Sequence, residues 1–218
     1  MENVMEKITY EKEYLARREL VLWGKELYTQ GLVKGSGGNL SIRLDDNTVL
    51  FTPTGFFLGH MTEECISKCD MEGKVLDGEQ PTKEVPLHLA VYRTRPNIRA
   101  VCHTHSIYAV TYASSVEPGT IMPVCTPSLA AKVGLVEIKG YAHPGSIELG
   151  QLVEEGLARA NAVLLANHGV VAVGKHMEAA VSAANEVENN AMLLALGTSF
   201  IHPLCKEDVE HLIKKVSL

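Results

Sequence analysis

Two histidines one residue apart, His103 and His105, close an apolar stretch that predicts a β-strand. Because successive side chains of a strand point to opposite faces, residues two apart share a face, and both imidazoles project together from the strand's end. Two imidazoles placed in this way can bind one metal ion, and a catalytic zinc commonly takes three protein ligands and keeps one position open. The pair therefore constrains the fold, because distant parts of the chain must bring further ligands to the end of this strand.

Two other residues can supply those ligands. His168 lies in a polar triplet between two runs of Ala, Val and Leu, which predict buried strands on both sides of it. Glu84 begins a segment whose apolar spacing predicts a helix over 84–94, with Thr82 as a cap, and a carboxylate suits the positive end of a helix. An isolated His-x-His pair is usually structural, so the prediction depends on all four residues together. The predicted ligand set is Glu84, His103, His105 and His168.

The composition is that of an ordinary globular protein: 218 residues, 46% of them hydrophobic, with a formal net charge of -6. We expect residues 1–218 to form one domain, because no linker or repeat interrupts them. The acidic balance and the lack of a Lys/Arg block argue against a nucleic-acid partner. No apolar leader and no run of membrane-spanning length occurs, which predicts a cytoplasmic protein without a membrane partner. An odd number of cysteines without paired spacing predicts reduced thiols.

A glycine cluster at 35–38 separates a predicted helix over 10–32 from a predicted strand over 39–44. Because a strand follows the glycines and no Lys-Ser/Thr pair does, neither the dinucleotide fingerprint nor the Walker loop is present. The N–H groups of such a turn can still form a nest for an anion. Other segments predict strands over 48–51 and at 75–76, helices over 61–68, 147–160 and 176–196, and an amphipathic tail over 205–218.

Five short motifs follow one another in the order Gly35-Ser36-Gly37-Gly38-Asn39-Leu40-Ser41, Thr52-Pro53-Thr54-Gly55, Thr82-Lys83-Glu84, His103-Thr104-His105 and Asn167-His168-Gly169. With these motifs the chain resembles the class II aldolase and adducin family over roughly residues 15–200. The resemblance implies an α/β fold in which a central, mainly antiparallel sheet lies in a three-layer α/β/α sandwich. It also implies a homotetramer with fourfold symmetry and active sites between subunits.

The resemblance gives roles to particular residues. Glu84 would bind a divalent metal, with Zn²⁺ the expected ion, together with the three histidines, and would also be the catalytic residue that gives a proton to the substrate carbon or removes it. The ion would act as a Lewis acid on the ketone oxygen of a sugar phosphate and stabilise the enediolate formed when a carbon–carbon bond breaks. The substrate phosphate would be bound by Gly38, Asn39, Thr54, Gly55, Thr82 and Lys83.

Four functions within this family are open. Our first expectation is cleavage of L-fuculose 1-phosphate or a similar ketose phosphate to dihydroxyacetone phosphate and an aldehyde. Members with that activity have a tyrosine where this chain has Pro127, so the acid at the aldehyde end is unassigned and Tyr141 is only a candidate. The second is decarboxylation of a 3-oxo-tetronate 4-phosphate, since such members share Thr126-Pro127, His143-Pro144-Gly145 and a lysine like Lys83, which would then face a carboxylate.

A pentulose-phosphate 4-epimerase ranks third, because such members tend to carry Asp in place of Glu84. A non-catalytic adducin-like module ranks last, because that alternative predicts eroded metal ligands and all four candidates are present here.

Overall fold

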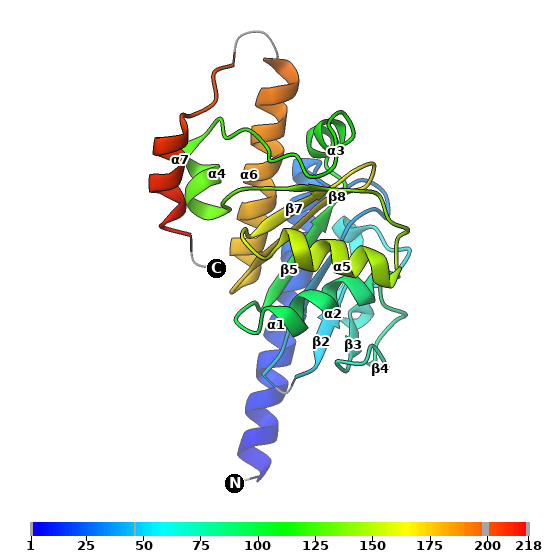
Figure 1. Cartoon of the computed structure of the whole chain (residues 1–218). Helices are drawn as coiled ribbons and strands as arrows, with labels where there is room; N and C mark the ends of the chain where they lie inside the picture. Colours follow the sequence, from blue (N-terminus) through cyan, green and yellow to red (C-terminus); the bar gives the residue numbers. More distant parts are fainter. Residues whose placement is uncertain (1, 46, 198–200, 217–218) are drawn as a thin grey trace.

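The computed structural model describes residues 2–45, 47–197 and 201–216, and its centre is one eight-stranded sheet (Figure 1). The strands lie in the order β4-β3-β2-β1-β5-β8-β7-β6, and every neighbouring pair is antiparallel except β6 and β7. Their bounds are β1 Asn39–Arg43, β2 Val49–Phe51, β3 Ser67–Cys69, β4 Val75–Asp77, β5 Ala100–Thr104, β6 Ile138–Lys139, β7 Ala162–Leu165 and β8 Gly169–Gly174. The predicted mainly antiparallel sheet is confirmed.

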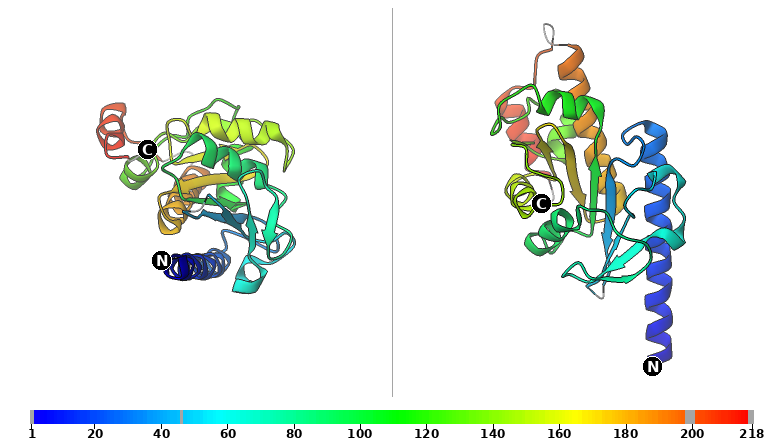
Figure 2. Two further views of the ribbon diagram at one scale, coloured as in Figure 1. Left: turned by 90° about the horizontal axis from the view of Figure 1, so that it is seen from below. Right: turned by 90° about the vertical axis from the view of Figure 1, so that its right-hand side faces the viewer.

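Helices cover both faces of the sheet, so the predicted three-layer α/β/α sandwich is confirmed as well. α1, α3 and α6 pack on one face and α2 and α5 on the other, which Figure 2 shows as layers on either side of the strands. α4 lies outside α6 and contacts α7. The helix bounds are α1 Glu2–Gln30, α2 Val85–Thr94, α3 Ile107–Ala113, α4 Pro127–Lys132, α5 Ile147–Gly156, α6 Met177–Leu196 and α7 Lys206–Ile213.

The long first helix illustrates how spacing produces this packing. In α1, Ala16, Leu20 and Leu27 are buried, and Trp23 is partly buried against the same core. Steps of four, three and four residues place these side chains along one face of a helix with 3.6 residues per turn. That face lies on the sheet, and burying each Leu side chain contributes about 1.5–3 kcal/mol.

The alternation of side chains along β5 decides which layer receives its polar residues. Val101 belongs to the core beneath α2 and α5, whereas Cys102 belongs to the core beneath α1 and α6. His103, two residues after Val101, therefore points toward the side of α2 and α5. β1 follows the same rule: Leu40 packs under α1, so Asn39 and Ser41 face α2.

One predicted helix is wrong. The segment 61–68 contains only a 3₁₀ turn, η2 at Glu63–Cys65, and then enters strand β3. Lys68 pairs with Leu50 of β2, and Cys69 on the next position is fully buried. Pairing with an existing hairpin outweighed the weak helical preference of a short segment, because strand formation depends on its neighbours more than on local propensity.

The C-terminal tail forms α7, which packs on α4 and not on the sheet (Figure 1). Its apolar side includes the buried Val209. The predicted tail also includes residues 217 and 218, which lie outside the described residues. None of the described helices combines the length and the apolar character needed to cross a bilayer.

Candidate metal centre and phosphate cradle

Three chain segments meet at one edge of the sheet and bring the four predicted ligands together. His103 is near the end of β5 and His105 follows that strand, while His168 lies in the turn between β7 and β8. Glu84 occupies the N-cap position of α2. Thr82, which was predicted to cap this helix, instead accepts a hydrogen bond from the Glu84 N–H at 3.2 Å.

The ligand atoms are close enough to share one ion, since one atom from each of the four residues lies within 4.8 Å of the others. The His103 Nε2 atom is 3.0 Å from His105 Nε2 and 3.3 Å from His168 Nε2. Glu84 Oε1 is 3.2 Å from His168 Nε2. Imidazole nitrogens and a carboxylate oxygen are the donors that Zn²⁺ and similar divalent ions take in catalytic sites.

Two further observations fit a metal. Glu84 Oε1 is buried and accepts no hydrogen bond from any of the described residues, and a cation would satisfy it. The ring of His103 is fixed from behind, because its Nδ1 lies 2.9 Å from the carbonyl oxygen of Val170 and donates to it. This bond leaves the Nε2 lone pair facing the cluster, which is how backbone carbonyls commonly orient metal-binding histidines. The donor set therefore fits a divalent metal, and the four residues remain predicted ligands.

Within the cluster, the negative charge of Glu84 and the positive charge of a protonated His103 stabilise each other. Without a metal ion, burial alone would raise the pKa of Glu84, but a positively charged His103, the close approach of His103 and His168 at 3.2 Å, and the hydrogen bond from Asn39 outweigh burial and hold the pKa well below its ordinary value. Burial would likewise lower the pKa of His103, and the neighbouring Glu84 carboxylate raises it on balance. Glu84 is therefore an ionised carboxylate in this arrangement, able to act as an anionic ligand.

A glycine allows β8 to approach the ligands. A Cβ built on Gly169 would lie 2.2 Å from the Thr104 carbonyl oxygen and 3.1 Å from Cδ2 of His105, so no other residue fits there without displacing the backbone. Asn167, just before His168, adopts a left-handed conformation with φ 56, which Asn tolerates better than most residues. The Asn-His-Gly triplet thus makes a tight turn that brings His168 against β5.

The predicted phosphate-binding segments also lie side by side. The Thr52 N–H donates to the Leu40 carbonyl at 3.0 Å, and the Thr82 N–H donates to the Thr52 carbonyl at 3.1 Å. These bonds connect the glycine turn, the Thr52–Gly55 turn and the turn before Glu84. Of the six predicted residues, Asn39 and Thr82 are buried, Gly38 and Thr54 are partly exposed, and Gly55 and Lys83 are exposed.

The Asn39 side chain, predicted to bind phosphate, also contacts Glu84 and His88, which the sequence did not indicate. Its Nδ2 donates to Glu84 Oε2 at 2.8 Å, and its Oδ1 lies 2.5 Å from Nε2 of His88. An amide nitrogen carries two hydrogens, so one remains for a substrate oxygen. His88 is fully buried.

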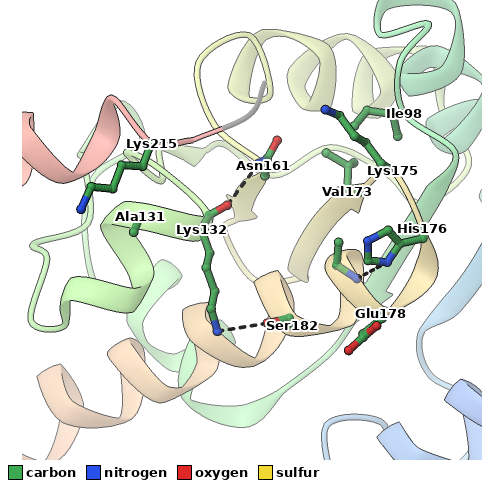
Figure 3. Close-up of a pocket in the computed structure, with 12 residues that line it drawn as sticks. Ile98, Ala131, Lys132, Asn161, Val173, Lys175, His176, Glu178, Ser182 and Lys215 are labelled. Carbon is green, nitrogen blue, oxygen red and sulfur yellow. Dashed lines mark hydrogen bonds between the residues drawn. The ribbon is translucent and has the colours of Figure 1, made fainter.

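A separate cavity of about 530 Å³ lies at the other end of β8, beside Gly174 (Figure 3). Lysines line it, but in Figure 3 the ammonium groups of Lys132, Lys175 and Lys215 are far apart and point in different directions. Lys132 is paired with Glu186 at 2.8 Å. These charges do not converge on one point, so the cavity offers no ligand set comparable with the histidine cluster.

The fold and the site together define an α/β sandwich protein. At one end of its central strands lie a cluster of three histidines and one glutamate and, beside it, three turns connected by backbone hydrogen bonds. The sequence profile described as the Class II Aldolase and Adducin N-terminal domain matches residues 18–195. The chain belongs to this family, as its motifs predicted. It is an enzyme of the aldolase or decarboxylase type.

Individual relatives carry two activities in their names. The chain is 38% identical over 203 residues to the 3-oxo-tetronate 4-phosphate decarboxylase of Pectobacterium atrosepticum, covering 92% of this chain and 93% of the relative. It is 36% identical over 167 residues to the L-fuculose phosphate aldolase of Methanococcus maripaludis, covering 77% and 89%. The crystal structure of YgbL from Klebsiella pneumoniae superposes on this chain with a TM-score of 0.86 at 35% identity, covering 92% of this chain and 98% of YgbL.

Proposed function

We propose that this protein is a metal-dependent 3-oxo-tetronate 4-phosphate decarboxylase that releases CO₂ and dihydroxyacetone phosphate. The observation that most supports this proposal is the similarity to the Pectobacterium decarboxylase, which extends over 92% of the chain. This reverses the order of our expectations from sequence, in which aldol cleavage came first. The predicted site residues are unchanged, because both reactions leave the same electron pair beside a ketone.

The position of Lys83 supports the decarboxylase. Its exposed side chain is next to Glu84 in the sequence. The turn His143-Pro144-Gly145 lies against its backbone, since a Cβ on Gly145 would be 2.8 Å from the Lys83 carbonyl oxygen. Two motifs that are distant in the sequence, and that resemble those of the decarboxylases, thus meet beside the ligand cluster. A lysine there can pair with the substrate carboxylate or phosphate.

In the proposed reaction the bond between C1 and C2 breaks, CO₂ departs and the electron pair passes toward the C3 ketone, after which C2 takes a proton. A bound Zn²⁺ or similar ion would supply a Lewis acid for the ketone oxygen. Glu84 would take up a proton from solvent and give it to C2. A Glu84 carboxyl that moves away from His103 and His168 would lose two of the contacts that depress its pKa, so its pKa would rise and it could carry a proton more readily.

The phosphate would lie in the cradle formed by Gly38, Asn39, Thr54, Gly55, Thr82 and Lys83. Main-chain N–H groups and hydroxyls in adjacent turns, with one lysine, suit a dianionic phosphate. Asn39 belongs to the cradle and also donates to the predicted ligand Glu84 at 2.8 Å, so one end of the substrate would be fixed while its ketone faces the cluster.

A second candidate is class II aldol cleavage of L-fuculose 1-phosphate or a similar ketose phosphate, which the 36% identity to the Methanococcus aldolase favours. Purified zinc-loaded protein should be incubated with each substrate, and dihydroxyacetone phosphate measured by a coupled enzyme assay. We expect turnover of the 3-oxo-tetronate 4-phosphate, and its loss in Glu84→Gln. Turnover of the fuculose phosphate alone would replace the decarboxylase with the aldolase.

We also propose a cytoplasmic homotetramer made of a single domain per chain, as in the family that the chain resembles. Large apolar side chains at the surface support subunit contacts, including Ile147 at 77% exposure and Leu196 at 67%. Light scattering on the purified protein should give four times the mass of one chain, and a monomeric mass would contradict this proposal.

A further inference from the structure

A row of buried polar side chains connects the interior of the protein to Glu84. Glu84, His88 and Tyr92 follow one another at intervals of four residues along the start and body of α2, so they share one helix face. Asn39 and Ser41 are two residues apart on β1 and share the strand face toward α2. Four helical residues and two strand residues both advance about 6–7 Å, so the two rows can interleave in register.

The hydrogen bonds alternate between the two rows without a gap. The Tyr92 hydroxyl is 2.7 Å from Ser41 Oγ, which is 2.6 Å from His88 Nδ1. His88 Nε2 is 2.5 Å from Asn39 Oδ1, and Asn39 Nδ2 is 2.8 Å from Glu84 Oε2. None of the five residues is more than 5% exposed.

The carboxylate at one end fixes the direction of the bonds among Asn39, His88 and Ser41. Ionised Glu84 can only accept, so Asn39 must present its NH₂ group to Glu84 and its oxygen to His88. His88 must then carry its hydrogen on Nε2, which leaves Nδ1 as an acceptor for the Ser41 hydroxyl. The Tyr92 hydroxyl lies within hydrogen-bond distance of both Ser41 Oγ, at 2.7 Å, and the Ser41 carbonyl oxygen, at 3.0 Å. Each amide and ring orientation is set by its neighbour and not chosen independently.

We infer that His88 is a positioning residue that holds Asn39 in the one amide orientation able to tie down Glu84 Oε2, leaving Oε1 free for a metal ion. The inference rests on the metal site of the proposed function but not on the identity of the substrate. Asn39 cannot pass a proton through its amide in this arrangement, so the row orients Glu84 and does not deliver protons to it. The His88 ring hydrogen-bonds to Ser41 and Asn39, and its backbone N–H donates to the Glu84 carbonyl oxygen at 3.4 Å, so the side chain acts on the Glu84 carboxylate through Asn39.

The test compares His88→Phe with Tyr92→Phe and measures Co²⁺ affinity by titration against a competing chelator. Phe keeps a ring that can pack edge-on to Phe51, as His88 does with ring centres 5.6 Å apart, but it removes both nitrogens. We expect a 10–100-fold loss of Co²⁺ affinity in His88→Phe, the range typical of residues that orient metal ligands. Tyr92→Phe removes one buried hydroxyl but keeps the Asn39–Glu84 contact, so its affinity should stay within about threefold.

His88→Gln serves as a conservative rescue, because its amide can again donate to Asn39, and it should recover at least part of the affinity. The visible spectrum of bound Co²⁺ reports its coordination and should change in His88→Phe but not in Tyr92→Phe. Wild-type affinity in His88→Phe, or an equal loss in Tyr92→Phe, would overturn the inference, since the loss would then follow general destabilisation.

A measurement on the unmutated protein covers the case in which His88→Phe does not fold. Long-range ¹H–¹⁵N spectra of the zinc-loaded protein distinguish the two neutral histidine tautomers, and His88 should carry its hydrogen on Nε2. A hydrogen on Nδ1 would reverse the direction of the row and overturn the inference. Neither experiment uses a sugar phosphate, so failure of the decarboxylase assay would leave both results interpretable.

Discussion

Gly38 gives the sharpest test of how the glycine turn is packed against the site. Its φ of +77 lies in the left-handed region, where a residue with a Cβ loses about 1–2 kcal/mol. A Cβ there would also lie 2.7 Å from Val33 Cγ1 and 2.8 Å from the His103 carbonyl oxygen. Overpacking of this kind adds about 1–3 kcal/mol, so Gly38→Ala should lower the free energy of unfolding by about 2–5 kcal/mol.

Gly31 is a matched control for this variant. It has the same φ of +77, but a Cβ would meet nothing within 4 Å, so Gly31→Ala isolates the backbone penalty of about 1–2 kcal/mol. Urea unfolding followed by circular dichroism, with metal removed by a chelator, measures both variants. The excess loss in Gly38→Ala is the contribution of close packing on β5, and it should be accompanied by weaker Co²⁺ binding because the displaced carbonyl belongs to His103. Equal losses in the two variants would refute this packing.

Three further predictions concern the metal site, the contact of Glu188 with α3 and the burial of His88. EDTA should abolish activity, and restoring Zn²⁺ to about 100 times its Kd should raise the free energy of unfolding by about 2.7 kcal/mol and the melting temperature by about 5–11 °C; an unchanged melting temperature would argue against the site. The Glu188 carboxylate accepts the Tyr108 and Ala109 N–H groups at 3.1 and 2.7 Å, so Glu188→Gln should lose about 1–3 kcal/mol in urea unfolding, and a neutral result would contradict this capping role. Burial lowers the pKa of His88 to about 3, assisted by the charge of His103, so the unfolded chain takes up a proton that the folded metal-free protein excludes between about pH 6.5 and 3. The stability advantage of wild type over His88→Gln should therefore shrink by about 1 kcal/mol per pH unit from pH 6 to 4, and a constant difference would show that His88 is protonated in the folded state.

Much of the site could be predicted because histidine and glutamate are residue types that commonly bind metals, and they can be recognised in the sequence. His103 and His105 follow from strand alternation alone, and His168 from the two apolar runs around it. The sequence alone could not show that these ligands meet, because their meeting requires β5 to lie between β1 and β8. The resemblance implied that the four ligands meet, where local periodicity could not, but it did not give the strand order.

Local reasoning failed where partners far along the chain decide the structure. The segment 61–68 becomes a strand because β2 offers it an edge, and nothing within the segment shows that edge. The short strand β6 was missed because two residues, Ile138 and Lys139, are too few for a periodic signal. The polar row on α2 was visible as Glu84, His88 and Tyr92 at four-residue spacing, but its meaning required knowing that β1 packs beneath it.

With a divalent ion bound at the predicted ligands, the charges at this end of the sheet would make one lysine enough for the proposed anionic substrate. Three neutral imidazoles and one carboxylate around the ion would leave a net charge of about +1, and Lys83 would add one more beside it. The chain as a whole carries -6, so this edge would be a local positive region on an acidic protein. Because the adjacent turns present neutral N–H groups and hydroxyls, the cradle can bind a phosphate without further cations. The buried row adds no charge to this site, and its Ser41, His88 and Asn39 side chains each donate a hydrogen toward the Glu84 carboxylate.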